Sequence, residues 1–312
     1  MSEVLFFEPV FMERVWGGRR LHNLYQKHLP HGVPIGESWE LVDRPEAQSV
    51  VHSGLHKGAT LHELWSNHRG DLFGAQSMEA GDRFPLLIKL LDANDRLSLQ
   101  VHPPADKAQA LKGEPKTEAW YLLHCESDAI LYAGFKEPCS REIFVQALEN
   151  GAAEELIHQI PVKENDCIFI PSGRVHAIGA GNVIFEVQQN SDTTYRVFDW
   201  NRLGLDGQPR VLHVAESLVS MDFGDVAPSV IDRQEEQLVD CPYFRLERWN
   251  LSGTRDALGE DDYAVFQVLN GLVEVGGLTA EPGQLFVIPH SSKGLELSAS
   301  TDSVKLLRVT VP

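Results

Sequence analysis

The 312-residue sequence has few cysteines, and it has far fewer basic residues than acidic ones. Its four cysteines are scattered and form no CxxC pair, which argues against a disulfide framework and favours a reducing cytoplasm. Only 27 lysines and arginines stand against 45 aspartates and glutamates, and the formal charge of −18 would repel a nucleic-acid backbone. We therefore expect no nucleic-acid partner.

Long apolar runs are also missing. The longest run, PLLIKLL, contains Lys89 and is far too short to span a membrane. The amino terminus carries Glu3, Glu8 and Glu13 and has no sustained apolar stretch, so it does not resemble a secretory signal. These features predict a cytoplasmic protein with no membrane partner, and they leave the oligomeric state open.

Short apolar runs separated by turn residues dominate the chain and predict a mainly β protein. The length and the 43% hydrophobic content allow one large core or two modest ones. Residues 1–55 have the pattern of antiparallel edge strands. Short helices are expected after Thr60 and Ser140, which are good helix caps. The run EAWYLLHCESDAILYAGF predicts a hairpin that turns near residues 126–128.

A set of polar residues lies on segments that are otherwise strand-like. In LSLQVH, apolar residues alternate with Ser98, Gln100 and His102, so a period of two places these three on one face. Glu118 opens the next strand, and His176 follows a tight turn in IPSGRVH. Buried strand histidines are more often hydrogen-bonded than metal-bound. Two imidazoles, a carboxylate and an amide together nevertheless match the ligands of a divalent metal with an open position.

Several of these motifs resemble blocks of known protein families. The combination of QxH, a following glutamate and PxGxxH resembles the way in which cupin barrels supply metal ligands. The type I mannose-6-phosphate isomerases, in particular the short bacterial form, have blocks similar to LSLQVHPP, KTEAWYLL, IPSGRVHAIGAG and EVQQNSDTTYRVFDWNR. Their opening blocks are similar to WGGRRL and IGESWEL, so the resemblance runs from about Trp16 to Arg202.

The resemblance implies a zinc-dependent aldose–ketose isomerase. Such an enzyme interconverts mannose 6-phosphate and fructose 6-phosphate through an enediolate, and its partner is therefore a small sugar phosphate. One zinc ion per chain would be bound by His102, Glu118 and His176, with Gln100 as a weaker fourth ligand. A metal with a free coordination position can polarise a carbonyl and stabilise the enediolate.

The resemblance also assigns residues to catalysis and to substrate binding. Arg196 and Lys116 are the candidate catalytic residues, and Arg196 would stabilise negative charge because a guanidinium does not act as a base. Lys89, Ser98 and Lys116 are the candidate residues for holding the phosphate. The general base stays open among Asp192, Lys116, a histidine and metal-bound water.

Two other functions compete with the isomerase. Two histidines and a carboxylate are also the ligand set of non-haem iron cupin dioxygenases. A non-catalytic cupin that binds a sugar phosphate would keep the same fold and the same pocket. The presence of Gln100, the surrounding lysines and Arg196 favours the isomerase over both.

A weak internal repeat follows residue 237. The segment EPGQLFVIPHSSKGLEL parallels KENDCIFIPSGRVHAIG, with Pro289 in the position of Pro171. The turn PHSSKG has no histidine in the position of His176, and nothing ahead of it replaces QxH or Glu118. The repeat therefore predicts a second barrel that carries no metal.

The predicted architecture is mainly β, with two cupin-like (jelly-roll) β-barrels and short helical insertions. Residues 1–225 would form the metal-binding catalytic domain, and residues 237–312 would form the second, metal-free barrel. The acidic segment DFGDVAPSVIDRQEE would link them. Buried members of the second core are expected to include the alternate apolar residues of two strands, namely Val265, Leu285 and Val287, and the turn residue Pro289.

Overall fold

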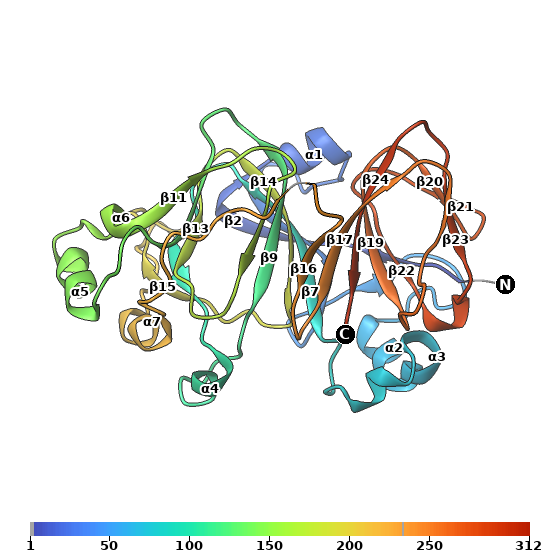
Figure 1. Cartoon of the computed structure of the whole chain (residues 1–312), viewed down its shortest axis with the longest axis horizontal. Coiled ribbons are helices and arrows are strands. Elements are labelled where there is room, and N and C mark those ends of the chain that lie inside the picture. The colour runs from blue at the N-terminus through green and yellow to red at the C-terminus, as the bar shows by residue number, and fades with distance from the viewer. Residues whose placement is uncertain (1–2, 233) are drawn as a thin grey trace.

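The computed structural model describes residues 3–232 and 234–312, and it contains two β-barrels that lie side by side (Figure 1). Each barrel is built from two antiparallel sheets, and helices are short and lie outside the sheets. The prediction of a mainly β protein with two barrels and short helical insertions is confirmed.

The first barrel contains most of the predicted site residues. Its larger sheet has the order β12 (Cys167–Ile170), β9 (Glu118–Cys125), β14 (Asn182–Gln189), β7 (Leu86–Ala93), β3 (Ile35–Leu41) and β2 (Val10–Gly18). Its smaller sheet has the order β11 (Ile157–Pro161), β10 (Ile130–Phe135), β13 (His176–Ile178), β8 (Leu99–Val101) and β15 (Tyr195–Phe198).

The second barrel is formed mainly by the carboxyl-terminal part of the chain. Its larger sheet has the order β16 (Gln237–Asp240), β17 (Arg245–Leu251), β24 (Val304–Thr310), β19 (Ala264–Asn270), β22 (Leu285–Ile288), β1 (Leu5–Glu8) and β6 (Val50–Val51). Its smaller sheet has the order β18 (Thr254–Asp256), β23 (Glu296–Ala299), β20 (Val273–Val275) and β21 (Leu278–Ala280). A separate ribbon pairs β4 (Asp43–Arg44) with β5 (Ala47–Gln48).

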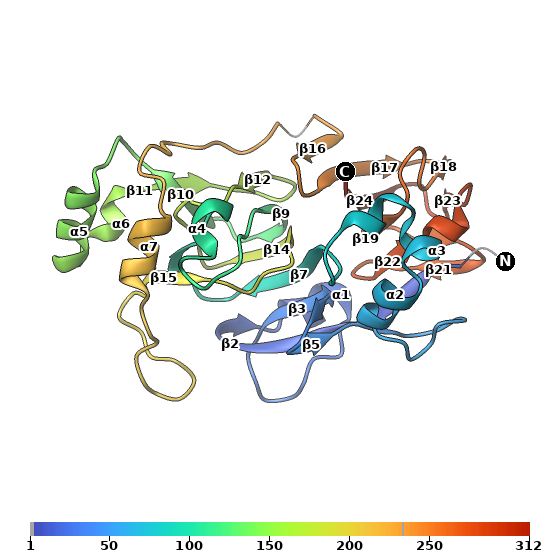
Figure 2. The ribbon, with the colours of Figure 1, turned by 90° about the horizontal axis from the view of Figure 1, so that it is seen from below.

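The helices lie around the barrels, and none in the described part of the chain has the length and apolarity of a membrane span. Figure 2 shows α4 and α7 beside the first barrel and α2 and α3 beside the second. Both expected caps are present: Thr60 Oγ1 accepts from Glu63 N, and Ser140 Oγ accepts from Ile143 N. The helices are α1 (Arg20–Tyr25), α2 (Leu61–Asn67), α3 (Arg69–Phe73), η1 (Gln76–Glu79), α4 (Ala105–Ala108), α5 (Arg141–Glu149), α6 (Ala153–Leu156), α7 (Val214–Ser220) and η2 (His290–Ser292).

The prediction of a hairpin that turns near residues 126–128 is wrong. Strand β9 pairs with β12 and β14 in the larger sheet, whereas β10 pairs with β11 and β13 in the smaller one. The connection therefore crosses from one sheet of the barrel to the other. An alternating apolar pattern identifies a strand, but it does not identify the strand's hydrogen-bonding partner.

The repeat between the two halves is confirmed by strand pairing. In the first barrel, Glu118 of β9 pairs with Ile170 of β12, the residue before the turn proline. In the second, Ala264 of β19 pairs with Ile288 of β22, again directly before a proline. Strands β14 and β24 then flank β9 and β19 on the other side. The same strand order thus recurs in both barrels.

The amino-terminal segment also contributes to the second barrel. Leu5 and Phe6 of β1 pair with Val287 and Phe286 of β22, and β6 continues that sheet. One hydrophobic cluster contains residues of both barrels, among them Phe185 and Val287. The predicted core residues of the second barrel, Val265, Leu285, Val287 and Pro289, are all buried. The division into residues 1–225 and 237–312 stays a prediction; strands β1 and β6 lie within residues 1–225 but belong to the second barrel's sheet, and the two barrels share a core cluster.

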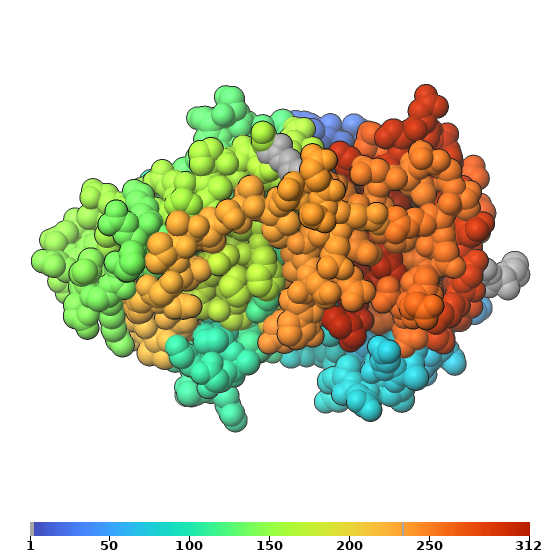
Figure 3. Space-filling model, in the orientation of Figure 1, coloured from blue at the N-terminus to red at the C-terminus, as the bar shows by residue number. Residues whose placement is uncertain are grey.

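The predicted linker runs over the surface of the first barrel before it enters β16 (Figure 3). Backbone hydrogen bonds hold it there: Phe135 N donates to Asp225 O, Ala227 N donates to Phe135 O, and Ile231 N donates to Cys167 O. The linker is therefore part of the first barrel's outer layer.

Candidate active site

A cavity of about 350 Å³ in the first barrel brings together the predicted catalytic and substrate-binding residues. Lys89 reaches it from β7, and Ser98 and Gln100 reach it from β8 and the residue before that strand. Lys116, which precedes β9, and Arg196 of β15 also line it. Residues from both sheets of the barrel thus converge on one cavity.

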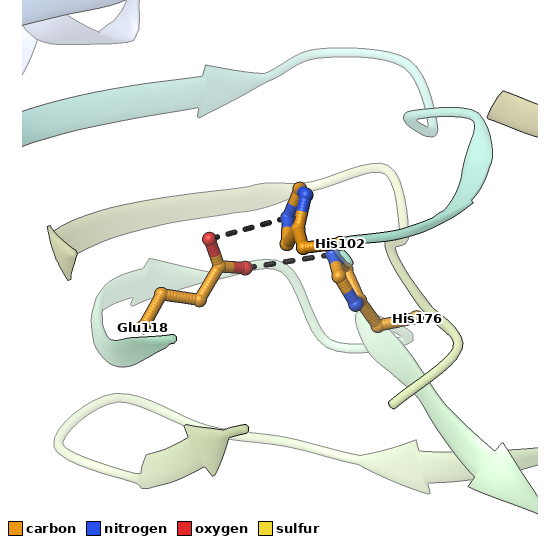
Figure 4. A group of neighbouring side chains, drawn as sticks. All are labelled: His102, Glu118 and His176. Carbon is orange, nitrogen blue, oxygen red and sulfur yellow. Dashed lines mark ion pairs between the residues drawn. The ribbon is translucent and has the colours of Figure 1, made fainter. Parts of the chain in front are cut away.

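The predicted histidine and glutamate ligands form one compact buried group beside this cavity. His102, Glu118 and His176 are all buried, and their potential ligand atoms lie within 4.8 Å of one another. His102 Nε2 is 3.4 Å from Glu118 Oε2, and His176 Nε2 is 3.5 Å from Glu118 Oε1. Figure 4 shows the three side chains pointing toward one another from separate segments.

Backbone carbonyl groups orient both imidazole rings. His102 Nδ1 lies 2.8 Å from Thr193 O, and His176 Nδ1 lies 2.9 Å from Arg174 O. A carbonyl oxygen only accepts, so Nδ1 carries the proton in both rings and donates to it. The lone pair of each Nε2 then faces Glu118, which is the arrangement found in histidines that bind a metal.

Unpartnered buried atoms test whether a metal fits this group. His102 Nε2 and both carboxylate oxygens of Glu118 are buried and satisfy no hydrogen-bond criterion with a described residue; the one close cation is Lys116, whose Nζ forms an ion pair with Glu118 Oε2 at 3.0 Å. Buried acceptors without partners are costly, and a cation placed among them would satisfy all three. Gln100 is also adjacent, with its Nε2 3.2 Å from His176 Nε2. The residues present therefore fit a divalent cation.

The protonation states of the two histidines and of Glu118 also suit metal binding. Burial, together with the charge of Lys116, lowers the pKa of His102 to about 4, and burial likewise lowers the pKa of His176. Both imidazoles are thus neutral near pH 7. Burial alone would raise the pKa of Glu118, but Lys116 and the histidines hold it well below its usual range. Lys116 Nζ lies 3.0 Å from Glu118 Oε2.

Lys89 has carboxylate partners that sequence reasoning missed. Its Nζ lies 3.2 Å from Glu186 Oε1 and 3.8 Å from Glu37 Oε2, and 5.3 Å from the centroid of the Trp39 ring. These contacts offset the cost of burying an ammonium group inside LLIKLL. A signal for both acids was present, since Glu186 is the single charge in NVIFEVQQ and Glu37 is one of two glutamates in the fully buried strand IGESWEL.

Acidic and basic side chains alternate across the larger sheet. Arg14 of β2, Glu37 of β3, Lys89 of β7 and Glu186 of β14 follow one another on neighbouring strands, and Lys116 continues the row ahead of β9. All five line the cavity. Each charged side chain therefore has a neighbour of opposite charge, which offsets the cost of removing these charges from water inside the barrel.

Arg196 faces the cavity with part of its guanidinium unengaged. Its Nη1 donates to Val211 O at 2.8 Å, while its buried Nε has no hydrogen-bond partner among the described residues. Burial lowers its pKa from the usual arginine value, yet the group stays protonated at any ordinary pH. Arg196 can therefore donate to negative charge that develops in the cavity.

Further residues of the wall were not singled out from the sequence as site residues. They include Thr194, Arg14 and Arg210, and no motif in the sequence identifies them. Trp16, the first residue of the block WGGRRL, is buried and also lines the cavity. Trp39, in the block IGESWEL, is buried in a separate small cluster. Asp192, one of the open candidates for the base, lines the cavity as well.

Comparisons with known proteins point to one family. Residues 4–136 match the catalytic domain of type I phosphomannose isomerase. Mannose-6-phosphate isomerase ManA of Bacillus subtilis is 40% identical over 286 residues, which is 86% of each chain. Mannose-6-phosphate isomerase of Streptococcus mutans is 36% identical over 317 residues, which is 97% of this chain and 98% of that one. The crystal structure of the mannose 6-phosphate isomerase from Bacillus subtilis covers 100% of both chains with a TM-score of 0.90 and 31% identity.

Proposed function

The chain belongs to the type I phosphomannose isomerase family, and we propose that it interconverts mannose 6-phosphate and fructose 6-phosphate. The observation that carries this function is the cavity beside the buried histidine and glutamate group. Five basic residues and three acidic ones line the cavity, although the whole chain has a formal charge of −18. A local excess of positive charge in an acidic protein suits an anionic substrate. The charged residues are Arg14, Lys89, Lys116, Arg196, Arg210, Glu37, Glu186 and Asp192.

Zinc is the cofactor that belongs to this proposal, with one ion per chain. His102, Glu118 and His176 would hold it, and Gln100 would be the fourth protein ligand. When bound, the metal supplies a Lewis acid that polarises the carbonyl of the open-chain sugar. The neutral imidazoles, the ionised carboxylate and the three unpartnered ligand atoms support this assignment.

Arg196 and Lys116 carry the catalytic roles. Arg196 would stabilise the oxyanion of the enediolate, since Arg196 lines the same cavity and its Nε–H has no hydrogen-bond partner among the described residues. Lys116 lies between Glu118 and the cavity and adds positive charge there. Isomerisation also needs a group that moves a proton between C1 and C2. Asp192 and Lys116 both line the cavity, and both stay candidates for that step.

The phosphate group would be held by Lys89, Ser98 and Lys116. Lys89 and Lys116 are both in contact with Glu186, at 3.2 Å and 3.9 Å, which places the two ammonium groups near each other. Ser98 is buried and adds a hydroxyl donor to the lining of the same cavity from the side of the smaller sheet. Two cations and a hydroxyl are suitable donors for a phosphate. A cytoplasmic location is part of this proposal and rests on the composition of the sequence.

Turnover and metal content of the purified protein test the proposal together. We expect one zinc ion per chain by elemental analysis and formation of fructose 6-phosphate from mannose 6-phosphate in a coupled assay. His102→Ala should lose both, whereas His31→Ala should lose neither because His31 is exposed and away from the cavity. Stoichiometric iron with oxygen consumption would indicate a dioxygenase instead. Bound metal without turnover would indicate a binding protein.

A further inference from the structure

The sequence blocks WGGRRL and IGESWEL form a tight crossing at one wall of the cavity. A Cβ atom on Gly17 would lie 2.4 Å from Gly36 N, and a Cβ atom on Gly36 would lie 2.6 Å from both Arg14 Cβ and Trp16 Cζ3. Only glycine fits at both positions. The two glycines let β2 and β3 approach closely, and this approach places Arg14 and Trp16 on the cavity wall.

Arg14 is held in place by acceptors behind it. Its Nε donates to Glu37 Oε1 at 2.7 Å, and its Nη1 donates to Glu13 O at 3.2 Å. Its Nη2 makes no hydrogen bond to a described residue, and 31% of the side chain is exposed. The guanidinium is thus oriented on one edge and open on the other.

Glu37 is itself rigidly placed. Trp39 Nε1 donates to Glu37 Oε2 at 2.6 Å, so each carboxylate oxygen has its own donor. Burial alone would raise the pKa of Glu37, but Lys89 and Arg14 outweigh it and lower the pKa to about 2. Glu37 is therefore ionised at any pH at which the protein works. It contacts both Arg14 and Lys89, so these two cations lie at the same end of the cavity.

Three of the other four cations of the wall are paired with carboxylates, and the fourth, Arg196, is assigned above to the enediolate. Lys89 and Lys116 are buried against Glu186 and Glu118. Arg210 donates to both oxygens of Asp199, at 2.7 and 2.6 Å. A phosphate entering the cavity meets in Arg14 a cation with an open N–H edge that is already oriented. Such an edge suits a phosphate oxygen, and little side-chain entropy is lost when it binds.

We propose that Arg14 is a substrate-binding residue that contacts the phosphate group of the sugar phosphate, with Glu37 as its positioning residue. This inference rests on the proposed function, and it gives the two amino-terminal blocks a part in substrate recognition. Lys89 supplies a buried point charge to the phosphate, whereas Arg14 supplies directional hydrogen bonds from the more exposed side. Selectivity for phosphorylated over neutral sugars then depends on the contact between Arg14 and the phosphate.

The test compares Arg14→Ala, Arg14→Lys and Glu37→Gln with wild type, and Arg141→Ala serves as the control. Arg141 is exposed at the start of α5 and does not line the cavity. Three quantities are measured: KM and kcat for mannose 6-phosphate, the Kd of inorganic phosphate by calorimetry, and the inhibition constant of mannitol as a neutral polyol. Metal content and thermal midpoint are recorded for every variant.

For Arg14→Ala we expect KM and the phosphate Kd to rise about tenfold or more, since hydrogen bonds to charged groups are among the stronger ones. The fall in kcat should be much smaller, and the mannitol constant should stay within about twofold. Arg14→Lys should recover part of the loss. Glu37→Gln should weaken phosphate binding more in the wild-type background than in the Arg14→Ala background, because the part of its effect that acts through Arg14 is lost with Arg14, whereas any part that acts through Lys89 persists.

A phosphate Kd that Arg14→Ala leaves unchanged would overturn the proposal, and so would an equal loss of mannitol binding. Weakening by Glu37→Gln that is equally large with and without Arg14 would overturn the positioning role. Calorimetry with inorganic phosphate needs no turnover, so this result is independent of the assay of the isomerase. Absence of turnover in the wild type would instead contradict the proposed function.

Discussion

The two barrels share a strand order but differ at matching positions of their inner faces. Glu118 of the first barrel, the proposed metal ligand, has Ala264 as its counterpart in the second, as the pairing with Ile170 and Ile288 shows. The carboxylate side chain of the proposed ligand is thus replaced by the methyl side chain of alanine. This difference removes the carboxylate around which the histidines of the first barrel converge.

A second matching position has its charges reversed. Lys89 of β7 pairs across the ladder with Glu186 of β14, and the equivalent strands β17 and β24 pair Glu247 with Arg308. Arg308 Nη1 donates to Glu247 Oε2, and Nη2 donates to Asp261 Oδ2, both at 2.6 Å. Its Nε and Nη2 also donate to the carbonyls of two neighbouring residues, Ala257 and Leu258.

This comparison separates a site from a scaffold. In the second barrel a permanently charged guanidinium satisfies its neighbours and is itself satisfied on several sides. In the first barrel, His102 and Glu118 keep buried acceptors without partners. Unpartnered buried groups are retained where a ligand completes them, and saturated ones are typical of structural interiors. The prediction that the second barrel carries no metal rests on its missing ligands, since Ala264 occupies the position of Glu118.

The largest effect is expected from making the first barrel resemble the second. Glu118→Ala places alanine where the second barrel has Ala264, and it removes one ligand and the only carboxylate of the group. We expect the variant to lose its metal and to lose turnover by about 10³-fold or more. Elemental analysis and the coupled assay measure both. Full metal content with a full rate would show that the two positions do not differ in function.

Arg196→Ala should separate charge stabilisation from metal binding. The guanidinium is a cavity-wall donor and contacts none of the proposed ligands among its hydrogen bonds. We expect metal content to stay near the wild-type value and turnover to fall by about 10²- to 10³-fold, as on removal of one donor to an oxyanion. Arg196→Lys provides the control for charge without the planar fork. Metal lost together with activity would make Arg196 a structural residue.

Arg308→Ala should reverse the pattern of Glu118→Ala. Its removal leaves Glu247 and Asp261 without their buried partner. We expect the free energy of unfolding to fall by on the order of 3–5 kcal/mol, since breaking a buried ion pair leaves an uncompensated charge. Denaturant unfolding measures the loss, and Arg308→Lys should recover part of it. Metal content per folded molecule should not change. A stable but metal-free variant would show instead that the ion pairs of Arg308 support metal binding in the first barrel.

The smallest effect is expected from His290→Ala. His290 directly follows the turn proline of the second barrel, and its Nδ1 lies 3.1 Å from Asp262 Oδ1 with 36% of the side chain exposed. A partly exposed contact of this kind contributes at most about 1 kcal/mol. Turnover and metal content should both match the wild type. An inactive variant that folds and binds zinc would assign to the second barrel a chemical role that the comparison denies it.

Local sequence patterns identified much of the site and part of the fold. The strand alternation in LSLQVH and the glycine turn before His176 brought out the proposed ligands, because each motif fixes its own side chain within a few residues. The caps Thr60 and Ser140 were identified for the same reason, since a cap bonds to a backbone group three residues away. The repeat between the barrels could be detected because strands in the same order produce a similar spacing of apolar and turn residues in the two halves of the sequence.

The sequence by itself determined the strand-rich class, the two barrels and the set of ligand types. Only the tertiary structure decided that β9 and β10 lie in different sheets, that β1 completes the second barrel, and that Lys89 lies between Glu37 and Glu186. It also decided that Arg14 reaches the cavity. The physical reason is that strand pairing and ion pairing join residues far apart in the chain, and an alternating pattern fits many partners equally well.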